Sequence, residues 1–174
     1  MRYLLIAVTA VAAWSQQLDL SKLDALAAKA RESATVDLDA DKLKLASGLI
    51  ASEGAARDAA QHISQMKGVF VRTFEFENTG AYTQADLDSV RNQLNAPNWN
   101  RILEVKDKDE LVEVWFYMEA GKSGGMAVIT AEPKELVVVN IVGPIDIQSL
   151  AKMGNALGVA DALKRLQEPK KPAK

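Results

Sequence analysis

Residues 136–142 constrain the fold more than any other segment of this chain. Their sequence, LVVVNIV, is apolar at both sets of alternating positions and contains one polar residue, Asn140. Successive side chains of a β-strand point to opposite faces of its sheet, so a strand that is apolar on both sides lies between two covering layers. The sequence therefore predicts a sheet with this strand at its centre.

Four more segments have the alternating or β-branched pattern of strands. They span residues 69–77, 101–106, 111–119 and 126–131. Short connections join the last four strands, at residues 101–106, 111–119, 126–131 and 136–142. These strands are therefore expected to be antiparallel neighbours. With residues 136–142, the pattern predicts five strands.

A helix is predicted between the first two of these strands. Thr83 and Asp86 have the spacing of a capping box, and Leu87, Val90 and Leu94 then recur at intervals of three and four. A strand–helix–strand unit of this kind permits a parallel, right-handed crossover. The predicted fold class is α+β: a mainly antiparallel five-stranded sheet with a strand–helix–strand crossover.

The segment before the first strand, residues 16–67, is predicted to be helical and to pack on the sheet. Ser21 and Asp24 are suited to capping a first helix, and residues 35–39 end it. Asp39 or Asp41 can cap a second helix, and a third is predicted over about residues 55–66. The face of the sheet opposite the crossover helix is then covered by these helices or by a second subunit of a homodimer.

Both ends of the chain differ from its middle. Arg2, an uncharged run over residues 3–14, and small residues at Ala13 and Ser15 have the pattern of a signal peptide over residues 1–15. Cleavage after Ser15 would make the protein periplasmic or secreted; the alternative is a buried N-terminal element of a cytosolic protein. A single domain is expected over 16–167, with a helical part at 16–67 and a sheet part at 68–167. The proline-broken, lysine-rich residues 168–174 are expected to be a disordered tail.

Composition excludes several functional classes. Lysine and arginine total 21 against 23 aspartate and glutamate residues, so the chain lacks the basic excess of a nucleic-acid binder. It contains no cysteine, which excludes disulfides, cysteine-based metal sites and a cysteine nucleophile. No second apolar stretch is long enough to span a membrane, so no transmembrane segment is expected. No cofactor is predicted.

One segment, AEPKELVVVNIVGPIDIQSL at residues 131–150, resembles the signature of the family called domain of unknown function 4252. Shorter segments agree with that family in the same order along the chain; they lie at residues 36–39, 43–47, 69–76, 80–82 and 87–91. The resemblance implies an exported bacterial protein, secreted or lipid-anchored, with no established activity and no catalytic residues to transfer. A lipoprotein form requires a cysteine, which this chain lacks.

Two short motifs have weak claims to chemistry. Gly121, Lys122 and Ser123 are similar to the end of a phosphate-binding loop, but such a loop needs a glycine where this chain has Phe116. A hairpin turn is the better interpretation. His62, the single histidine, has no neighbours at a recognised metal-ligand spacing, so we interpret it as an ordinary helix residue.

Two acidic patterns have equally weak claims to chemistry. Glu75 and Glu77 share one strand face, as an acid–base pair would, but a solvated strand end explains them better. Asp37, Asp39 and Asp41 alternate as calcium ligands sometimes do, yet the required glycine and final glutamate are missing. Helix capping is the stronger interpretation of these aspartates.

The best candidate for a partner surface is the strand face formed by Glu113, Trp115 and Tyr117. If that face is open, its two aromatic side chains can anchor a protein or glycan partner. If a helix covers it, they belong to the core, which is the commoner arrangement for aromatic strand residues.

These observations leave two hypotheses for function. The first is a non-enzymatic module of the cell envelope that binds another envelope protein or senses the state of the envelope. The second is a small secreted hydrolase or ligand-binding carrier. We favour the first, because the sequence shows no nucleophile–base pair and no catalytic residues can be named.

Overall fold

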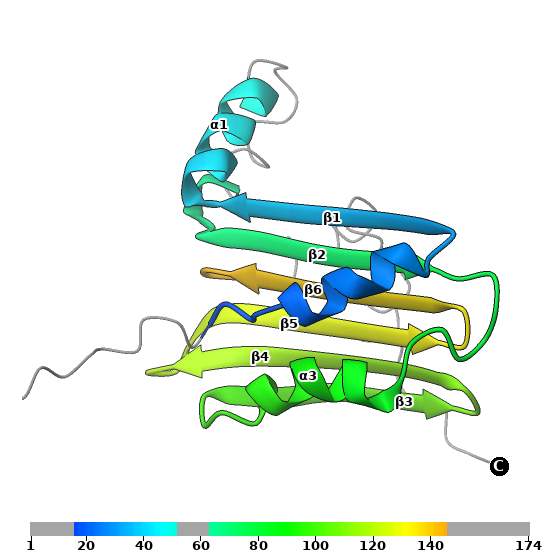
Figure 1. Cartoon of the computed structure of the whole chain (residues 1–174). Helices are drawn as coiled ribbons and strands as arrows, with labels where there is room; N and C mark the ends of the chain where they lie inside the picture. Colours follow the sequence, from blue (N-terminus) through cyan, green and yellow to red (C-terminus); the bar gives the residue numbers. More distant parts are fainter. Residues whose placement is uncertain (1–15, 52–62, 146–174) are drawn as a thin grey trace, which may run out of the picture.

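The computed structural model describes residues 16–51 and 63–145. Within them, one six-stranded antiparallel sheet has the strand order β1-β2-β6-β5-β4-β3 (Figure 1). Its strands are β1 (Glu32–Asp39), β2 (Gly68–Glu75), β3 (Trp99–Asp107), β4 (Glu110–Glu119), β5 (Lys122–Glu132) and β6 (Glu135–Val142). The helices are the 3-10 helix η1 (Ser21–Ala28), α1 (Ala40–Ala51) and α3 (Gln84–Leu94).

Strand β6 lies inside the sheet, as its sequence predicts. It is hydrogen-bonded to β2 on one side and to β5 on the other, and residues 136–142 are all buried. Alternate residues of β6 contribute to two separate apolar clusters: Leu136 and Val138 to one, and Val137, Val139 and Ile141 to the other. The clusters lie on opposite faces of the sheet because neighbouring strand residues point in opposite directions.

The first face of the sheet is covered by η1 and α3, which lie side by side in front of the strands in Figure 1. Leu23 and Leu26 of η1, together with Val90 and Leu94 of α3, pack in the cluster on this face. The predicted capping box of α3 is confirmed: Thr83 Oγ1 and the Thr83 backbone N–H both donate hydrogen bonds to Asp86 Oδ2.

The second face of the sheet carries the other apolar cluster. Its strand residues come from β2, β4, β5 and β6, with partly buried contributions from β1 and β3. We use "second face" below for the buried strand residues of this cluster: Val69, Val71, Val112, Val114, Phe116, Met126, Val128, Val137, Val139 and Ile141.

The prediction of five strands is wrong, because residues Glu32–Asp39 form a sixth, β1. We expected this stretch to lie in a helical N-terminal part spanning residues 16–67. Instead β1 pairs antiparallel with β2 along its full length, from Glu32 opposite Glu75 to Asp39 opposite Gly68. The pairing satisfies backbone groups on the edge of β2, and Val36 and Leu38 pack against the second face. Tertiary pairing therefore outweighed the helical pattern of the flanking residues.

The N-terminal helices also differ from their predicted form. Residues Ser21–Ala28 form a 3-10 helix whose N-cap is Leu20, without a side-chain capping bond, so the predicted Ser21 cap is wrong. The prediction for the second helix is confirmed: α1 follows Asp39, whose Oδ1 accepts a hydrogen bond of 3.0 Å from the Lys42 backbone N–H.

The strand–helix–strand unit does not join neighbouring strands. Strands β2 and β3 point in the same direction, but β6, β5 and β4 lie between them, and every hydrogen-bonded pair in the sheet is antiparallel. Helix α3 thus returns the chain to the far edge, from which β3 to β6 form a meander back to β2.

Several predictions lie outside the described residues. They are the signal peptide at residues 1–15, His62, most of the third helix, the part of the predicted domain after residue 145 and the tail at 168–174. Residues 63–65 of the third helix are described and are helical. None of the helices in the described part is both long enough and apolar enough to cross a membrane.

Candidate functional site

A groove of about 890 Å³ lies between α3 and the strands β3 and β4. Helix α3 and the residue that ends it, Asn95, contribute exposed polar side chains to one wall, among them Gln84 and Asn92. The opposite wall carries charged side chains of both signs from the β3–β4 hairpin, and Trp115 lines the groove as well. The charged lining residues are Asp88, Arg91, Arg101, Glu104, Lys106, Lys108, Asp109, Glu110 and Glu113.

The buried carboxylate of Glu113 organises this groove. Its side chain is only 1% exposed, and its two oxygens accept from two different arginines. Arg91 Nε donates to Oε2 at 2.9 Å, and Arg101 Nη1 donates to Oε1 at 3.2 Å. The carboxylate thus ties α3 to β3 and β4. These ion pairs hold the side chains in place, because leaving the buried carboxylate of Glu113 unpaired would cost about 3–5 kcal/mol by comparison with measured buried pairs.

Arg101 extends the network to the open side of the groove. It also forms an ion pair with Glu104, and its guanidinium carbon lies 5.4 Å from the centroid of the Trp115 ring. A cation at this distance over an indole face is attracted to the ring. Within the described residues, the buried indole N–H of Trp115 has no hydrogen-bond acceptor.

The structure places Glu113, Trp115 and Tyr117 on the first face, under α3 and the adjoining loop. Tyr117 is buried, receives a hydrogen bond of 2.8 Å from Asn98 Nδ2 and makes an edge contact with Trp99, with ring centroids 5.5 Å apart. An open partner surface requires an uncovered face, and Glu113 and Tyr117 do not meet that condition. Trp115 is half-buried and keeps a place in the groove wall.

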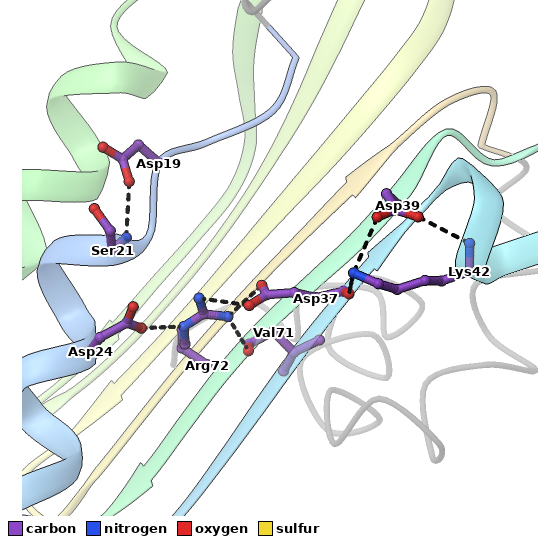
Figure 2. Close-up of polar contacts among 8 residues, drawn as sticks. All are labelled: Asp19, Ser21, Asp24, Asp37, Asp39, Lys42, Val71 and Arg72. Carbon is purple, nitrogen blue, oxygen red and sulfur yellow. Dashed lines mark hydrogen bonds and ion pairs between the residues drawn. The ribbon is translucent and has the colours of Figure 1, made fainter.

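Sequence reasoning missed a second charged cluster, centred on Arg72 (Figure 2). The Arg72 side chain is buried; Nε donates to Asp24 at 2.6 Å, and Nη1 and Nη2 donate to the two oxygens of Asp37 at 2.7 and 3.1 Å. These bonds fasten η1 and β1 to β2. A charged residue in the middle of the apolar segment VFVRTFEF was the available signal, because a buried charge needs a partner.

The alternating aspartates therefore act separately. Asp37 pairs with Arg72, and Asp39 caps α1 and pairs with Lys42, as Figure 2 shows. Among the described residues, no group of three or more acidic, histidine or cysteine side chains is arranged to hold a metal ion. The capping interpretation is confirmed for Asp39.

The hairpin interpretation of residues 121–123 is also confirmed. Gly121 lies in the turn that joins β4 to β5, and Lys122 and Ser123 begin β5. The φ angles of Ala120 and Gly121 are both positive, at 49° and 76°, as a tight two-residue β-hairpin turn requires. This backbone runs from strand to strand and does not open a helix, as a phosphate-binding loop would.

Glu75 and Glu77 have different surroundings in the structure. Glu75 forms an ion pair with Arg31, and Glu77 is exposed beyond the end of β2. Glu75 instead belongs to a row of cross-strand carboxylates, in which Glu135 faces Glu75 on one side and Glu132 on the other. Burial, and then the charges of Glu132 and Glu75, raise the pKa of Glu135 above its usual value.

The raised pKa of Glu135 gives a prediction for stability. A carboxyl whose folded pKa exceeds its unfolded pKa destabilises the fold at a pH above both values, and this penalty disappears below the unfolded pKa. At pH 7, Glu135→Gln is expected to increase the free energy of unfolding by up to about 1 kcal/mol, which raises the urea midpoint. It should leave the midpoint unchanged near pH 3.5, below the usual glutamate pKa of about 4.3. Equal gains at both pH values would contradict the electrostatic cause, and exposed Glu77→Gln is the control.

The fold and its groove define an α+β protein built on one antiparallel sheet, with an ion-paired polar groove at one edge. The family model described as "Domain of unknown function (DUF4252)" matches residues 28–153. The chain belongs to this family, as residues 131–150 indicate. The comparison with curated proteins found no match.

Proposed function

We propose that this protein is an exported, non-enzymatic binding module that holds a segment of another envelope protein in the groove between α3 and the β3–β4 hairpin. The observation that carries the proposal is the arrangement of the groove itself. Its walls come from separate elements, and the buried Glu113 holds the arginines of both walls in fixed positions. Fixed polar groups recognise a partner at low entropic cost, because little side-chain freedom is lost on binding.

The lining chemistry fits a polar segment of mixed charge. The charged residues of the groove comprise four basic and five acidic side chains, so neither sign dominates. Asn92, Asn95 and Gln84 add exposed amides, which both donate and accept hydrogen bonds. An extended polypeptide offers donors, acceptors and side chains of either charge to such a surface.

Recognition fits the groove better than proton transfer. A general base must come within hydrogen-bond reach of a substrate proton. The Glu113 side chain is only 1% exposed and both its oxygens accept from guanidinium groups, and Arg101 also pairs with Glu104. The side chains at the centre of the groove are therefore engaged with one another.

A second candidate function is a small-ligand carrier or hydrolase, and the concave shape of the groove favours it. Ligand pockets have volumes of about 300–1,000 Å³, a range that includes this groove. A small molecule retained by the purified protein, or turnover of an envelope substrate, would support this candidate over the first.

Export remains part of the proposal and rests on residues 1–15. Arg2, the uncharged run at residues 3–14 and the small residues Ala13 and Ser15 support cleavage before Gln16. The intact mass of protein recovered from its native envelope tests this. A mature chain that retains Met1 would contradict it.

The binding proposal is tested by capturing partners from the native envelope with two matched variants of the full chain. Asn92 and Ala85 are both exposed on α3, but only Asn92 lines the groove. Asn92→Lys is expected to weaken capture about tenfold, which corresponds to about 1.4 kcal/mol, whereas Ala85→Lys should capture as the parent does. Thermal melts of both variants should match the parent. Equal capture by the two variants would show that the groove is not the contact site.

A further inference from the structure

Strand β1 forms one edge of the sheet, and no other strand of the described part lies on its outer side (Figure 1). Its residues Glu32–Thr35 are all exposed. The outer edge of a strand carries backbone N–H and C=O groups that can pair with another strand. An added strand has to match the groups that this edge presents.

The hydrogen bonds of β2 fix which backbone groups of β1 point outward. The Phe76 backbone N–H donates to the Lys134 carbonyl at 2.8 Å, on the β6 side of β2. Successive residues of an antiparallel strand direct their backbone groups to alternate sides, so the odd-numbered residues of β2 bond to β1. By the register, these lie opposite even-numbered residues of β1. The N–H and C=O groups of Ser33, Thr35 and Asp37 therefore point away from the sheet.

One of these outward groups already has a partner. The Asp37 carbonyl accepts a hydrogen bond of 3.1 Å from Lys42 Nζ (Figure 2). Within residues 16–51 and 63–145, the outward backbone groups of Ser33 and Thr35 have no partner. The unpaired part of the edge is thus centred on Ala34, with one open residue on each side.

The two edges of the sheet differ in how they are protected from pairing. Strand β3, at the opposite edge, has a register shift between Arg101 and Leu103 and exposed charges along its length. Bulges and charges are devices by which proteins prevent pairing at a sheet edge. Strand β1 pairs with β2 in an unbroken register, and its residues 33–36 are uncharged. The β1 edge is therefore the one open to an added strand.

The charges on either side of residues 33–36 indicate that a second copy of this chain supplies the added strand. Basic Lys29 and Arg31 precede the stretch, and acidic Asp37 and Asp39 follow it. In antiparallel pairing of two copies, the start of each strand lies beside the end of the other, so opposite charges meet at both ends. Three of these side chains also form ion pairs within the chain, so the added contacts select the direction of pairing more than they add affinity.

We propose that two copies of this chain dimerise through β1, in an antiparallel register that places the two Ala34 residues on the two-fold axis. Ser33 of each copy then lies opposite Thr35 of the other, and each such pair exchanges two backbone hydrogen bonds. This register uses the unpaired groups of both copies and leaves the Asp37 carbonyl bonded to Lys42. The groove lies at the opposite edge of the sheet, so the proposal is independent of it.

The same register keeps like charges apart. Arg31 of one copy lies opposite Asp37 of the other, and Glu32 lies opposite Val36. The second strand is displaced toward the start of β1, away from the end at which α1 begins (Figure 1). The two-fold axis makes the contact identical for both copies, so the assembly closes as a dimer.

A disulfide across the axis tests the register, and the absence of native cysteine gives the link a single origin. Residues opposite each other in a non-hydrogen-bonded pair have Cα atoms about 4.5 Å apart, which a disulfide can bridge. Under mild oxidation of the full chain, Ala34→Cys should form a linked dimer at least tenfold faster than Ser33→Cys, whose two sulfurs would be offset along the strands. Ala85→Cys, exposed on α3, is the control for random collision. Equal rates for the three variants would overturn the proposal.

Sedimentation of uncross-linked variants tests the edge itself. Thr35→Pro removes an outward N–H that β2 does not use, as a proline on an edge strand can. It should raise the dimer dissociation constant at least tenfold, whereas Thr35→Val, which keeps the N–H, should match the parent. Ala34→Lys sets two lysines against each other at the axis and should act like Thr35→Pro without altering the backbone. A dimer that both Thr35→Pro and Ala34→Lys leave intact would place the contact elsewhere and overturn the proposal.

Amide hydrogen exchange distinguishes a second copy from another segment of the same chain. The amides of Ser33 and Thr35 should exchange quickly in dilute protein and at least tenfold more slowly at concentrations where the dimer forms. Protection that is equal at all concentrations would assign the edge to a segment of the same chain and overturn the proposal. A parent that stays monomeric at millimolar concentration would overturn it as well.

Discussion

Val139→Asp is expected to leave the protein unfolded in buffer without denaturant. Val139 is 0% exposed at the centre of β6 and lies between Val71 of β2 and Val128 of β5. An unpaired carboxylate at such a site costs several kcal/mol, comparable to a typical total stability of about 5–15 kcal/mol. Circular dichroism and urea melts measure the result.

The neighbouring Val138→Asp provides an informative comparison. Val138 is equally buried but points to the first face, where it lies directly opposite Arg72. A carboxylate there gains a nearby guanidinium, so this variant should lose less stability than Val139→Asp. Lys108→Ala, in the exposed turn after β3, should change the free energy of unfolding by about 0.5 kcal/mol or less. A Val139→Asp protein with the parent's urea midpoint would show that the second face is not buried.

Arg91→Met is expected to destabilise the protein by about 3 kcal/mol. The substitution removes one of the two arginines bonded to the buried carboxylate of Glu113 and leaves the longer bond to Arg101. Breaking a buried ion pair from one side is costly, because the remaining charge stays desolvated. The urea midpoint measures the loss.

A double variant separates this electrostatic cause from lost packing. Arg91→Met/Glu113→Leu replaces both charges with apolar groups of similar size, and such replacements are often neutral in measured cases. Most of the stability lost in Arg91→Met should therefore return in the double variant. If the double variant is as unstable as Arg91→Met alone, packing of the Arg91 side chain is the cause.

The sequence predicted the central part of the fold well because local patterns and tertiary contacts agree there. Residues 136–142 are apolar on both sides, and the short connections before them leave little choice of pairing. Strand β1 was missed because its pattern is weak, since buried and exposed residues alternate only from Val36 onward. Its position also depends on the free edge of β2, which begins more than thirty residues after β1 begins.

The candidate site was predicted only in part. Glu113 and Trp115 share a strand face, which the sequence pattern predicts, and both line the groove. Their partners Arg91 and Arg101 come from α3 and β3, and a sequence pattern within β4 contains no information about them. Arg72 was missed for a similar reason, since its partners Asp24 and Asp37 lie in η1 and β1.

The strand order of the sheet also has a consequence for folding kinetics. Strands β3 to β6 are joined by short turns and can pair early, whereas β2 must meet β6 across about sixty intervening residues. Closing such long loops slows folding, so β2 and β1 are expected to join last. Until then the valine-rich β6 is an exposed edge strand, and such edges pair readily with other chains. Aggregation during refolding should therefore increase steeply with protein concentration.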